Sequence, residues 1–188
     1  MHDFVVEIFG GERMKNIVYI ATAIDGYIAT PEGGLEWLEN IPNPEKSDFG
    51  YNDFIDSIDG VVMGKNTFEK VLSFGSWPYN KKVFVLSNTL KSVPEKLSKK
   101  AEIVNGNIPD IISKLNGRGF SNLYIDGGKT IQSFLKLNLI DEMIISKVSI
   151  LLGNGIPLFG SLEVPINFTV LKTNKLNESL VQTHYKRK

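Results

Sequence analysis

Two glycine-containing turns, each between an apolar run and a helical pattern, are the segments best suited to bind an anion. In one of them, residues 122–125 end at Asp126-Gly127-Gly128, and apolar residues recur at helical spacing from Thr130 onward. A helix that starts directly after a strand leaves its first amide N–H groups unpaired, and glycine lets an anion approach them. We therefore expect a phosphate here, although a tight turn with a structural role alone explains two glycines equally well.

The second turn repeats this pattern and adds a lysine. A short buried strand, residues 60–63, is followed by Gly64-Lys65-Asn66-Thr67, which opens a helix. A lysine in the first turn of a helix opposes the helix dipole, and a bound anion would relieve that conflict. The alternative is a flexible surface lysine that points into water.

Asp48 is the candidate catalytic carboxylate. Apolar residues at positions 51, 54, 55 and 58 predict a helix with one buried face from Ser47 onward, and Asp48 lies at the margin of that face. The same position also suits an ordinary N-terminal capping carboxylate. Three further aspartates on this helix lie away from the buried face and indicate a solvated surface rather than a metal site.

The composition excludes several kinds of chemistry. The 188 residues include 21 Lys/Arg, 21 Asp/Glu, no cysteine and two histidines, His2 and His184, near the ends of the chain. Nucleic-acid binding, disulfides, thiolate catalysis and metal sites are therefore not expected. No apolar run is long enough to cross a membrane. We expect a cytoplasmic protein whose proton chemistry rests on carboxylates, tyrosine, lysine or water.

The remaining elements predict one α/β domain. Residues 17–23 predict an apolar strand that we expect to continue through Tyr27–Ala29. Residues 83–86 predict a second strand, which ends in Ser87-Asn88-Thr89. Residues 101–104 predict a third strand, and residues 109–115 predict a helix. Residues 168–172 and 179–185 alternate as in an antiparallel hairpin. Strands that alternate with helices and end in a hairpin predict a mostly parallel sheet with an antiparallel edge.

Two segments allow alternative interpretations. Thr30–Leu38 is rich in glycine and carries Trp37, so it is either a mobile lid or a loop pinned by one aromatic anchor. Residues 1–13 are interpreted as an extension that is not native, with the domain spanning residues 14–188, because Gly10–Arg13 can be encoded by a purine-rich run.

An ordered set of motifs resembles the dihydrofolate reductase superfamily. The set runs from Asp25–Ala29 through Met63–Glu69, Val85–Ser87 and Ile125–Gly128 to residues 152–155. Within the superfamily, the chain is similar over about residues 15–187 to the C-terminal reductase domain of the bifunctional riboflavin-biosynthesis deaminase-reductase, the RibD C-terminal domain family.

The resemblance implies a three-layer α/β/α fold and an NADPH-dependent reductase of a small heterocycle. It places Asp48 as the carboxylate that holds the substrate ring and assists proton delivery. The other implied site residues are Asp25, Trp37, Phe49 and Asn52 for the substrate; Ala21 and Ile28 for the nicotinamide; Gly64, Lys65, Asn66 and Thr67 for phosphates, with Lys65 at the 2′-phosphate; Leu86, Ser87 and Asn88 for the adenosine; and Gly127, Gly128, Lys129 and Thr130 for the pyrophosphate.

Two departures from the pattern argue against folate as the substrate. Lys81 stands where those enzymes carry a folate-binding arginine, and lysine cannot form the same bidentate contact. Asp126 replaces the first glycine of a three-glycine run. We expect a pterin- or pyrimidine-like substrate; the alternatives are a non-catalytic nucleotide- or flavin-binding protein, and a 5-amino-6-(5-phosphoribosylamino)uracil reductase. A homodimer formed through the closing hairpin is also expected.

Overall fold

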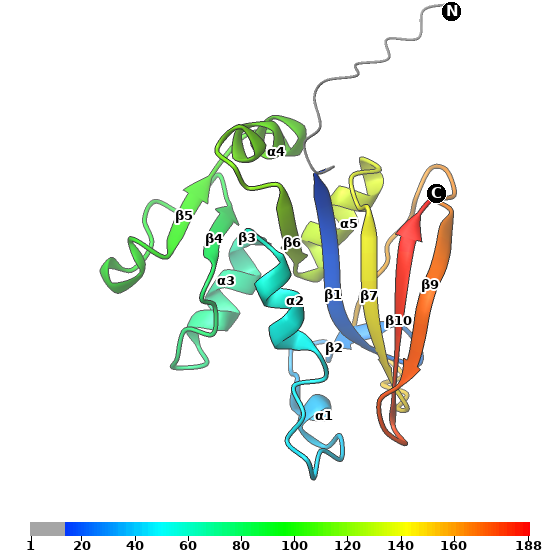
Figure 1. The fold of residues 1–188 in the computed structure, drawn as a ribbon. Coiled ribbons are helices and arrows are strands. Elements are labelled where there is room, and N and C mark those ends of the chain that lie inside the picture. Colours follow the sequence, from blue (N-terminus) through cyan, green and yellow to red (C-terminus); the bar gives the residue numbers. More distant parts are fainter. Residues whose placement is uncertain (1–13) are drawn as a thin grey trace, which may run out of the picture.

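A central eight-stranded sheet organises the molecule, and its strand order is β5-β4-β3-β6-β1-β7-β10-β9 (Figure 1). The computed structural model describes residues 14–188, so the interpretation of residues 1–13 lies outside the described residues. The strands of this sheet are β1 (Lys15–Ala23), β3 (Gly60–Gly64), β4 (Lys82–Leu86), β5 (Ala101–Val104), β6 (Asn122–Asp126), β7 (Glu142–Val148), β9 (Phe168–Lys175) and β10 (Leu180–Arg187). The helices are α1 (Glu36–Glu39), α2 (Tyr51–Ser57), α3 (Lys65–Leu72), α4 (Ile108–Gly117) and α5 (Gly128–Lys136), with a 3-10 turn at Glu95–Leu97.

The predicted mixture of parallel and antiparallel strands is confirmed. Every neighbouring pair from β5 to β7 is parallel, whereas β10 is antiparallel to both β7 and β9. The edge strand β9 exposes Val170 and Leu171. The expected homodimer through this hairpin stays a prediction.

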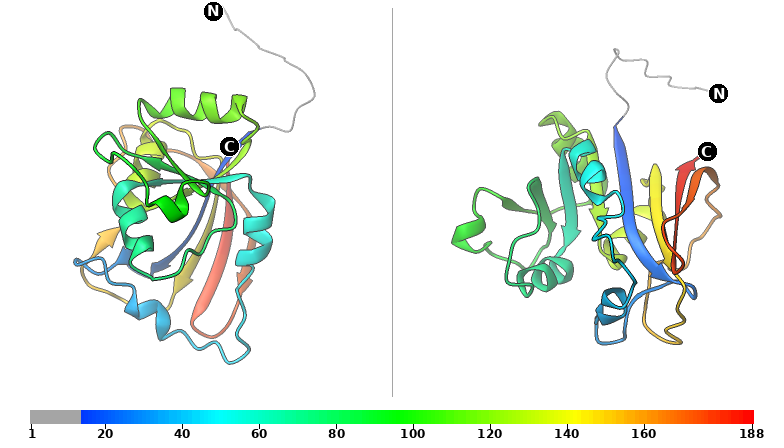
Figure 2. Two further views of the ribbon diagram at one scale, coloured as in Figure 1. Left: turned by 90° about the vertical axis from the view of Figure 1, so that its left-hand side faces the viewer. Right: turned by 60° about the horizontal axis from the view of Figure 1, so that its bottom comes forward.

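Helices cover both faces of the sheet, which gives the expected three layers. Side chains of α2 and α3 pack on one face together with Val61 and Met63, and those of α4 and α5 pack on the other with Val62. Successive residues of a strand point to opposite faces, so a strand buried on both sides is a continuous apolar run. Figures 1 and 2 show α2 and α5 on opposite sides of the sheet.

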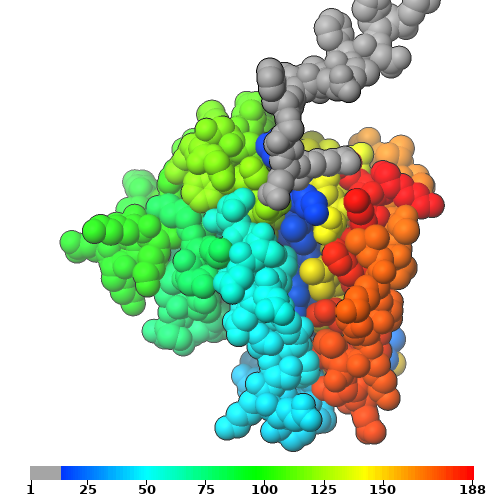
Figure 3. Space-filling view, viewed as in Figure 1, coloured from blue at the N-terminus to red at the C-terminus, as the bar shows by residue number. Residues whose placement is uncertain are grey.

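The segment that leads into α2 reaches the C-terminal hairpin. Figure 3 shows the two side by side on one face of the molecule, and Asn177 Nδ2 donates to the Pro42 carbonyl at 2.9 Å. The predicted helix start at Ser47 is wrong, because α2 begins only at Tyr51. Phe49 and Gly50 both have positive φ angles, +55° and +86°, and a right-handed helix cannot pass through them.

Tyr27–Ala29 does not continue β1, contrary to expectation. It forms a separate strand, β2, which pairs antiparallel with β8 (Ile156–Pro157). A turn closed by Gly26 N–H and the Ala23 carbonyl at 3.0 Å takes the chain out of the main sheet. Gly26 adopts a φ of +82°, which glycine reaches without steric cost.

Trp37 fixes the Thr30–Leu38 segment to the body of the protein. Its side chain is buried and packs with Ala23, Val148 and Leu180. The structure therefore favours the loop pinned by an aromatic anchor over the mobile lid. Among residues 14–188, no helix has both the length and the apolar character needed to span a membrane.

Candidate active site

A cavity of about 910 Å³ opens at the carboxyl ends of β1, β3 and β6, where the N-termini of α3 and α5 meet the Thr30–Leu38 segment. The carboxyl ends of strands are the usual ligand-binding edge of an α/β sheet. A cavity of this size accommodates a cofactor-sized molecule.

The two glycine turns lie side by side in the cavity wall, because β3 and β6 are neighbours in the sheet. They also pack against each other. A Cβ atom on Gly127 would collide with Thr67 Oγ1, and one on Gly64 would lie 2.9 Å from Thr130 Oγ1. Contacts this close leave no room for a larger residue, so the geometry of each turn depends on the other.

Positive charge collects around these turns. Neither α3 nor α5 has an acidic residue in its first turn, and Lys65 and Lys129 occupy those turns. Lys70 lines the same cavity. The Nζ of Lys65 lies 3.6 Å from Glu69 Oε1, but both side chains are solvent-exposed, and such a pair holds its lysine only weakly. The two helix N-termini and three lysines make this part of the cavity suitable for phosphate groups.

Another part of the cavity wall consists of phenol rings around one carboxyl group. Tyr19, Tyr51, Tyr79 and Tyr124 all line the cavity, as does Asp126. The Tyr79 hydroxyl donates to Asp126 Oδ2 at 3.1 Å, and the Gly127 N–H donates to Oδ1 at 2.8 Å. The Tyr124 hydroxyl donates to the Tyr19 carbonyl at 2.9 Å.

Burial is the largest cause of the pKa shifts in this cluster. It raises the pKa of Asp126, and the hydrogen bonds from Tyr79 and Gly127 oppose that rise only in part. Burial and then the charge of Asp126 raise the pKa of Tyr51 to about 12. The same two causes raise the pKa of Tyr79 and of Tyr124. These phenols are therefore neutral hydrogen-bond donors at physiological pH.

Most of the predicted cofactor residues meet in this cavity. Those that line it are Ala21, Ile28, Gly64, Lys65, Asn66, Thr67, Gly127, Gly128, Lys129 and Thr130. Leu86, Ser87 and Asn88 are not in its wall, although Leu86 pairs with Gly64 at the same sheet edge. The Ser87 hydroxyl accepts from the Leu90 N–H at 2.9 Å and shapes the loop that follows β4.

The predicted substrate residues do not line the cavity. Asp48 is exposed, and its two carboxylate oxygens accept from the Gly50 and Asn52 N–H groups, each at 3.0 Å. These two hydrogen bonds lower the pKa of Asp48. This is the geometry of the capping alternative, and a catalytic role for Asp48 stays a prediction.

The other four substrate candidates also lie outside the cavity wall. Asp25 Oδ2 accepts from the Gly153 N–H at 2.8 Å, and Trp37 is buried under the loop. The Phe49 carbonyl accepts from the Tyr19 hydroxyl at 3.0 Å, while Asn52 is exposed.

Sequence reasoning missed the tyrosines and the inward orientation of Asp126. A signal was present in β6, because residues two apart on a strand share a face and Tyr124 stands two before Asp126. β1, which carries Tyr19, pairs with β6. Nothing local in the sequence connects Tyr51 and Tyr79 to these strands.

The sequence model of one family, described as the RibD C-terminal domain, matches residues 15–182. The chain belongs to this family. A crystal structure of a protein from Shewanella sp. PV-4 that is assigned to riboflavin biosynthesis is 53% identical, with a TM-score of 0.91 over 93% of this chain and 99% of that one. The uncharacterized protein YwjB of Bacillus subtilis (strain 168) is 32% identical and covers 92% of this chain and 98% of its own length.

The likeness extends to the dihydrofolate reductase fold. Dihydrofolate reductase from Enterococcus faecalis, in a complex with NADP(H) and RAB-propyl, has a TM-score of 0.65 over 92% of this chain and 96% of that one. At 15% identity this likeness concerns the fold alone. The expected family and fold class of this RibD C-terminal domain protein are thereby confirmed.

Proposed function

We propose that this protein is an NADPH-dependent reductase that transfers hydride to a small pterin- or pyrimidine-like heterocycle. The observation that carries the proposal is that one cavity combines a part with two helix N-termini and three lysines and a polar, aromatic part. The first part suits a dinucleotide, and the second suits a planar ring beside it. Membership of the RibD C-terminal domain family and the fold shared with an NADP(H)-bound dihydrofolate reductase support this assignment.

Within the proposal, each part of the cavity has a separate task. The turns at Gly64–Thr67 and Gly127–Thr130 bind phosphate groups through backbone N–H groups, and Lys65 pairs with the 2′-phosphate. Ala21 and Ile28 are small or apolar and border the nicotinamide. NADPH supplies the hydride, while the protein orients the substrate and excludes water from the reacting atoms.

The test is fluorescence titration of NADPH and NADH on the wild type, Lys65→Ala and Lys81→Ala. We expect Lys65→Ala to weaken NADPH binding by about tenfold or more and to leave NADH binding nearly unchanged, since only NADPH carries the 2′-phosphate. Lys81→Ala is the matched control, because its Nζ contacts the Asp56 carbonyl at 3.3 Å and it does not line the cavity. Binding of neither cofactor by the wild type would contradict the proposal.

A parallel titration with FMN examines the alternative of a non-catalytic nucleotide- or flavin-binding protein. Preference for FMN over both nicotinamide cofactors would favour that alternative.

A further inference from the structure

One hydrogen bond links the C-terminal hairpin to the wall of the cavity. Tyr19 of β1 lines the cavity and Gln182 of β10 does not, yet Gln182 Nε2 donates to the Tyr19 hydroxyl at 3.1 Å. We propose that Gln182 is a positioning residue for heterocycle binding, because it fixes the Tyr19 side chain against which the planar ring packs. This inference rests on the proposed function and deepens it.

Gln182 reaches Tyr19 across the strand between them, β7. Figure 1 shows β1, β7 and β10 side by side, and Ala21, Ser146 and Gln182 pair in one row across these strands. Tyr19 lies two residues before Ala21, so its side chain points to the same face of the sheet as that of Gln182. Gln182 Nε2 also donates to the Ser146 hydroxyl at 3.1 Å. The amide is therefore anchored on β7 as well as on the phenol.

The Tyr19 hydroxyl has a partner on each side. It accepts from Gln182 and donates to the Phe49 carbonyl at 3.0 Å. Phe49 has a φ of +55° and lies in the segment that leads into α2. This backbone conformation is uncommon for a residue with a side chain, and the bond from Tyr19 supports it. One hydroxyl thus connects β10 to the segment just before Tyr51, another residue of the cavity wall.

The Tyr19 ring belongs to an aromatic surface that suits a planar ligand. It stacks on Phe54 with ring centroids 4.7 Å apart and meets Tyr51 edge to face at 5.6 Å. Stacking sets the plane of the ring, but a stacked ring can still slide in that plane. The two hydrogen bonds at the hydroxyl end prevent such sliding. A heterocycle therefore meets a surface that is already in place, which lowers the entropy cost of binding.

The probe is pterin, titrated by calorimetry in saturating NADPH against the wild type, Gln182→Leu, Tyr19→Phe and the double variant. Gln182→Leu removes the amide and keeps most of the side-chain volume. We expect this substitution to weaken pterin binding by about fivefold, the effect of one neutral hydrogen bond. NADPH affinity should change by less than about twofold, because β1 and β7 separate β10 from the glycine turns after β3 and β6.

Thr183→Val is the matched control on the same strand. Thr183 follows Gln182 directly, so its side chain points to the opposite face of the sheet, and its hydroxyl lies 3.2 Å from that of Thr173. This variant also loses one polar group from β10, but it has no link to Tyr19. We expect its pterin affinity to stay within about twofold of the wild type. An equal loss in both variants would overturn the role given to Gln182.

The double variant shows whether Gln182 acts through the Tyr19 hydroxyl. In Tyr19→Phe that hydroxyl is absent, so Gln182→Leu has no further effect to exert through it. We expect Gln182→Leu to weaken pterin binding by about fivefold in the wild type and by less than about twofold in Tyr19→Phe. The same loss in both backgrounds would indicate general support of the hairpin and overturn the proposal.

Tyrosine absorbance gives a readout that general loosening of the structure does not reproduce. Burial raises the pKa of Tyr19 most, the Gln182 hydrogen bond lowers it, and the charge of Asp48 raises it. Subtracting the titration of Tyr19→Phe from that of its parent isolates Tyr19, because Asp48, Tyr51 and Tyr124 are unchanged. Gln182→Leu should shift this titration to higher pH, whereas exposure of the phenol to water would shift it lower. A titration that does not move, or moves lower, overturns the positioning role.

The wild type separates this inference from the proposed function. A wild type that binds NADPH but no pterin overturns the inference and leaves the cofactor assignment standing. A wild type that binds no NADPH contradicts the proposed function itself.

Discussion

Thr67 and Gly127 belong to different glycine turns, yet they are packed so closely that Gly127 has no space for a side chain. A Cβ atom there would collide with Thr67 Oγ1, and Gly127 adopts a φ of +90°. The contact joins the start of α3 to the start of α5. The two predicted phosphate-binding segments therefore form one unit.

Gly127→Ala should damage both turns at once. We expect a loss of about 2 kcal/mol or more in the free energy of unfolding, from backbone strain and collision, together with NADPH binding weakened more than tenfold. Urea denaturation and cofactor titration measure the two effects.

Gly119→Ala is the matched control, because Gly119 has nearly the same φ, +89°, and nothing within 4 Å of the added Cβ. It should cost only about 1 kcal/mol and leave cofactor binding unchanged. Equal effects of the two substitutions would rule out the contact with Thr67 as the cause.

Lys129 and Lys136 lie at opposite ends of α5 and should contribute to stability with opposite signs. Lys129 occupies the first turn, where a cation opposes the helix dipole, and Lys136 the last, where it is favourable. Both side chains are exposed. We expect Lys129→Ala to leave the ligand-free protein as stable or slightly more stable, and Lys136→Ala to cost about 0.3–1 kcal/mol at low salt.

Cofactor binding distinguishes the same two lysines. Lys129→Ala should weaken NADPH binding several-fold, because Lys129 lines the cavity, whereas Lys136 does not. Thermal unfolding with and without NADPH measures both quantities. A loss of stability in ligand-free Lys129→Ala would contradict the view that this lysine is placed for an anion.

Asp126→Asn should become relatively more stable as pH rises. The folded-state pKa of Asp126 is raised above its ordinary value of 3.8, so its contribution to stability is fully present below that value. The contribution is lost as pH rises through the folded-state pKa, and asparagine cannot ionise. Unfolding free energies of variant and wild type, compared from about pH 4 to pH 8, should shift in favour of the variant. Asp48→Asn provides the contrast: the pKa of Asp48 is lowered from 3.8, so the wild type should gain over that variant only as pH rises through the acid range to about that value, and the difference should stay level at higher pH. Parallel slopes for the two substitutions would contradict the different environments of these carboxyl groups.

Local sequence patterns sufficed for most of the sheet and for the glycine turns. A strand such as β3 is buried on both faces, so its apolar run and the glycine that follows it define its bounds without knowledge of its neighbours. The separate strand β2 could not be foreseen in this way. Its partner, β8, lies far along the chain, and nothing in residues 27–29 indicates a pairing with residues 156–157.

The chemistry of the cavity was less predictable than its glycine turns. Tyr124 shares β6 with Asp126, but Tyr19, Tyr51 and Tyr79 come from distant parts of the chain, and only the fold brings them into the same cavity wall. Asp48 is separated from α2 by Phe49 and Gly50, which both have left-handed backbone conformations. Whether the Asp48 carboxylate points into the cavity or accepts from the N–H groups at the helix start depends on the conformation of these two residues. A residue count along the chain cannot resolve that choice.

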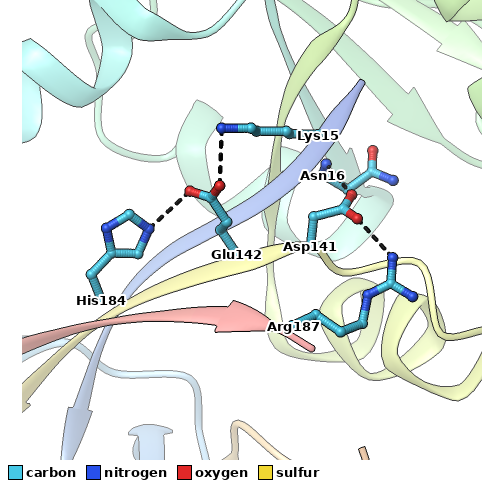
Figure 4. A network of polar contacts seen from close by, with 6 residues as sticks. All are labelled: Lys15, Asn16, Asp141, Glu142, His184 and Arg187. Carbon is cyan, nitrogen blue, oxygen red and sulfur yellow. Dashed lines mark hydrogen bonds and ion pairs between the residues drawn. The ribbon is translucent and has the colours of Figure 1, made fainter. Parts of the chain in front are cut away.

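Glu142 lies in a polar network at the start of β7, where Figure 4 shows it between Lys15 and His184. Its Oε1 lies 3.0 Å from Lys15 Nζ and its Oε2 2.9 Å from His184 Nε2. Burial alone would raise the pKa of Glu142, but the bonds to Lys15 and His184 outweigh it, and the pKa is lowered. Stability from this carboxylate is therefore present above its ordinary pKa of 4.5 and lost as pH falls through the folded-state value.

Glu142→Gln should accordingly destabilise the protein at neutral pH and have little effect in acid. We expect a cost of about 1–2 kcal/mol near neutral pH, kept modest because the exposed Lys15 is screened by solvent. The cost should shrink as pH falls below 4.5, opposite in sign to the trend for Asp126→Asn.

Glu102→Gln is the control. Its partner Arg118, 2.8 Å away, is exposed, so this substitution should cost under about 1 kcal/mol in the free energy of unfolding. Urea denaturation of both variants across this pH range is the measurement, and a cost for Glu142→Gln that grows in acid would contradict the stabilising role of Lys15 and His184.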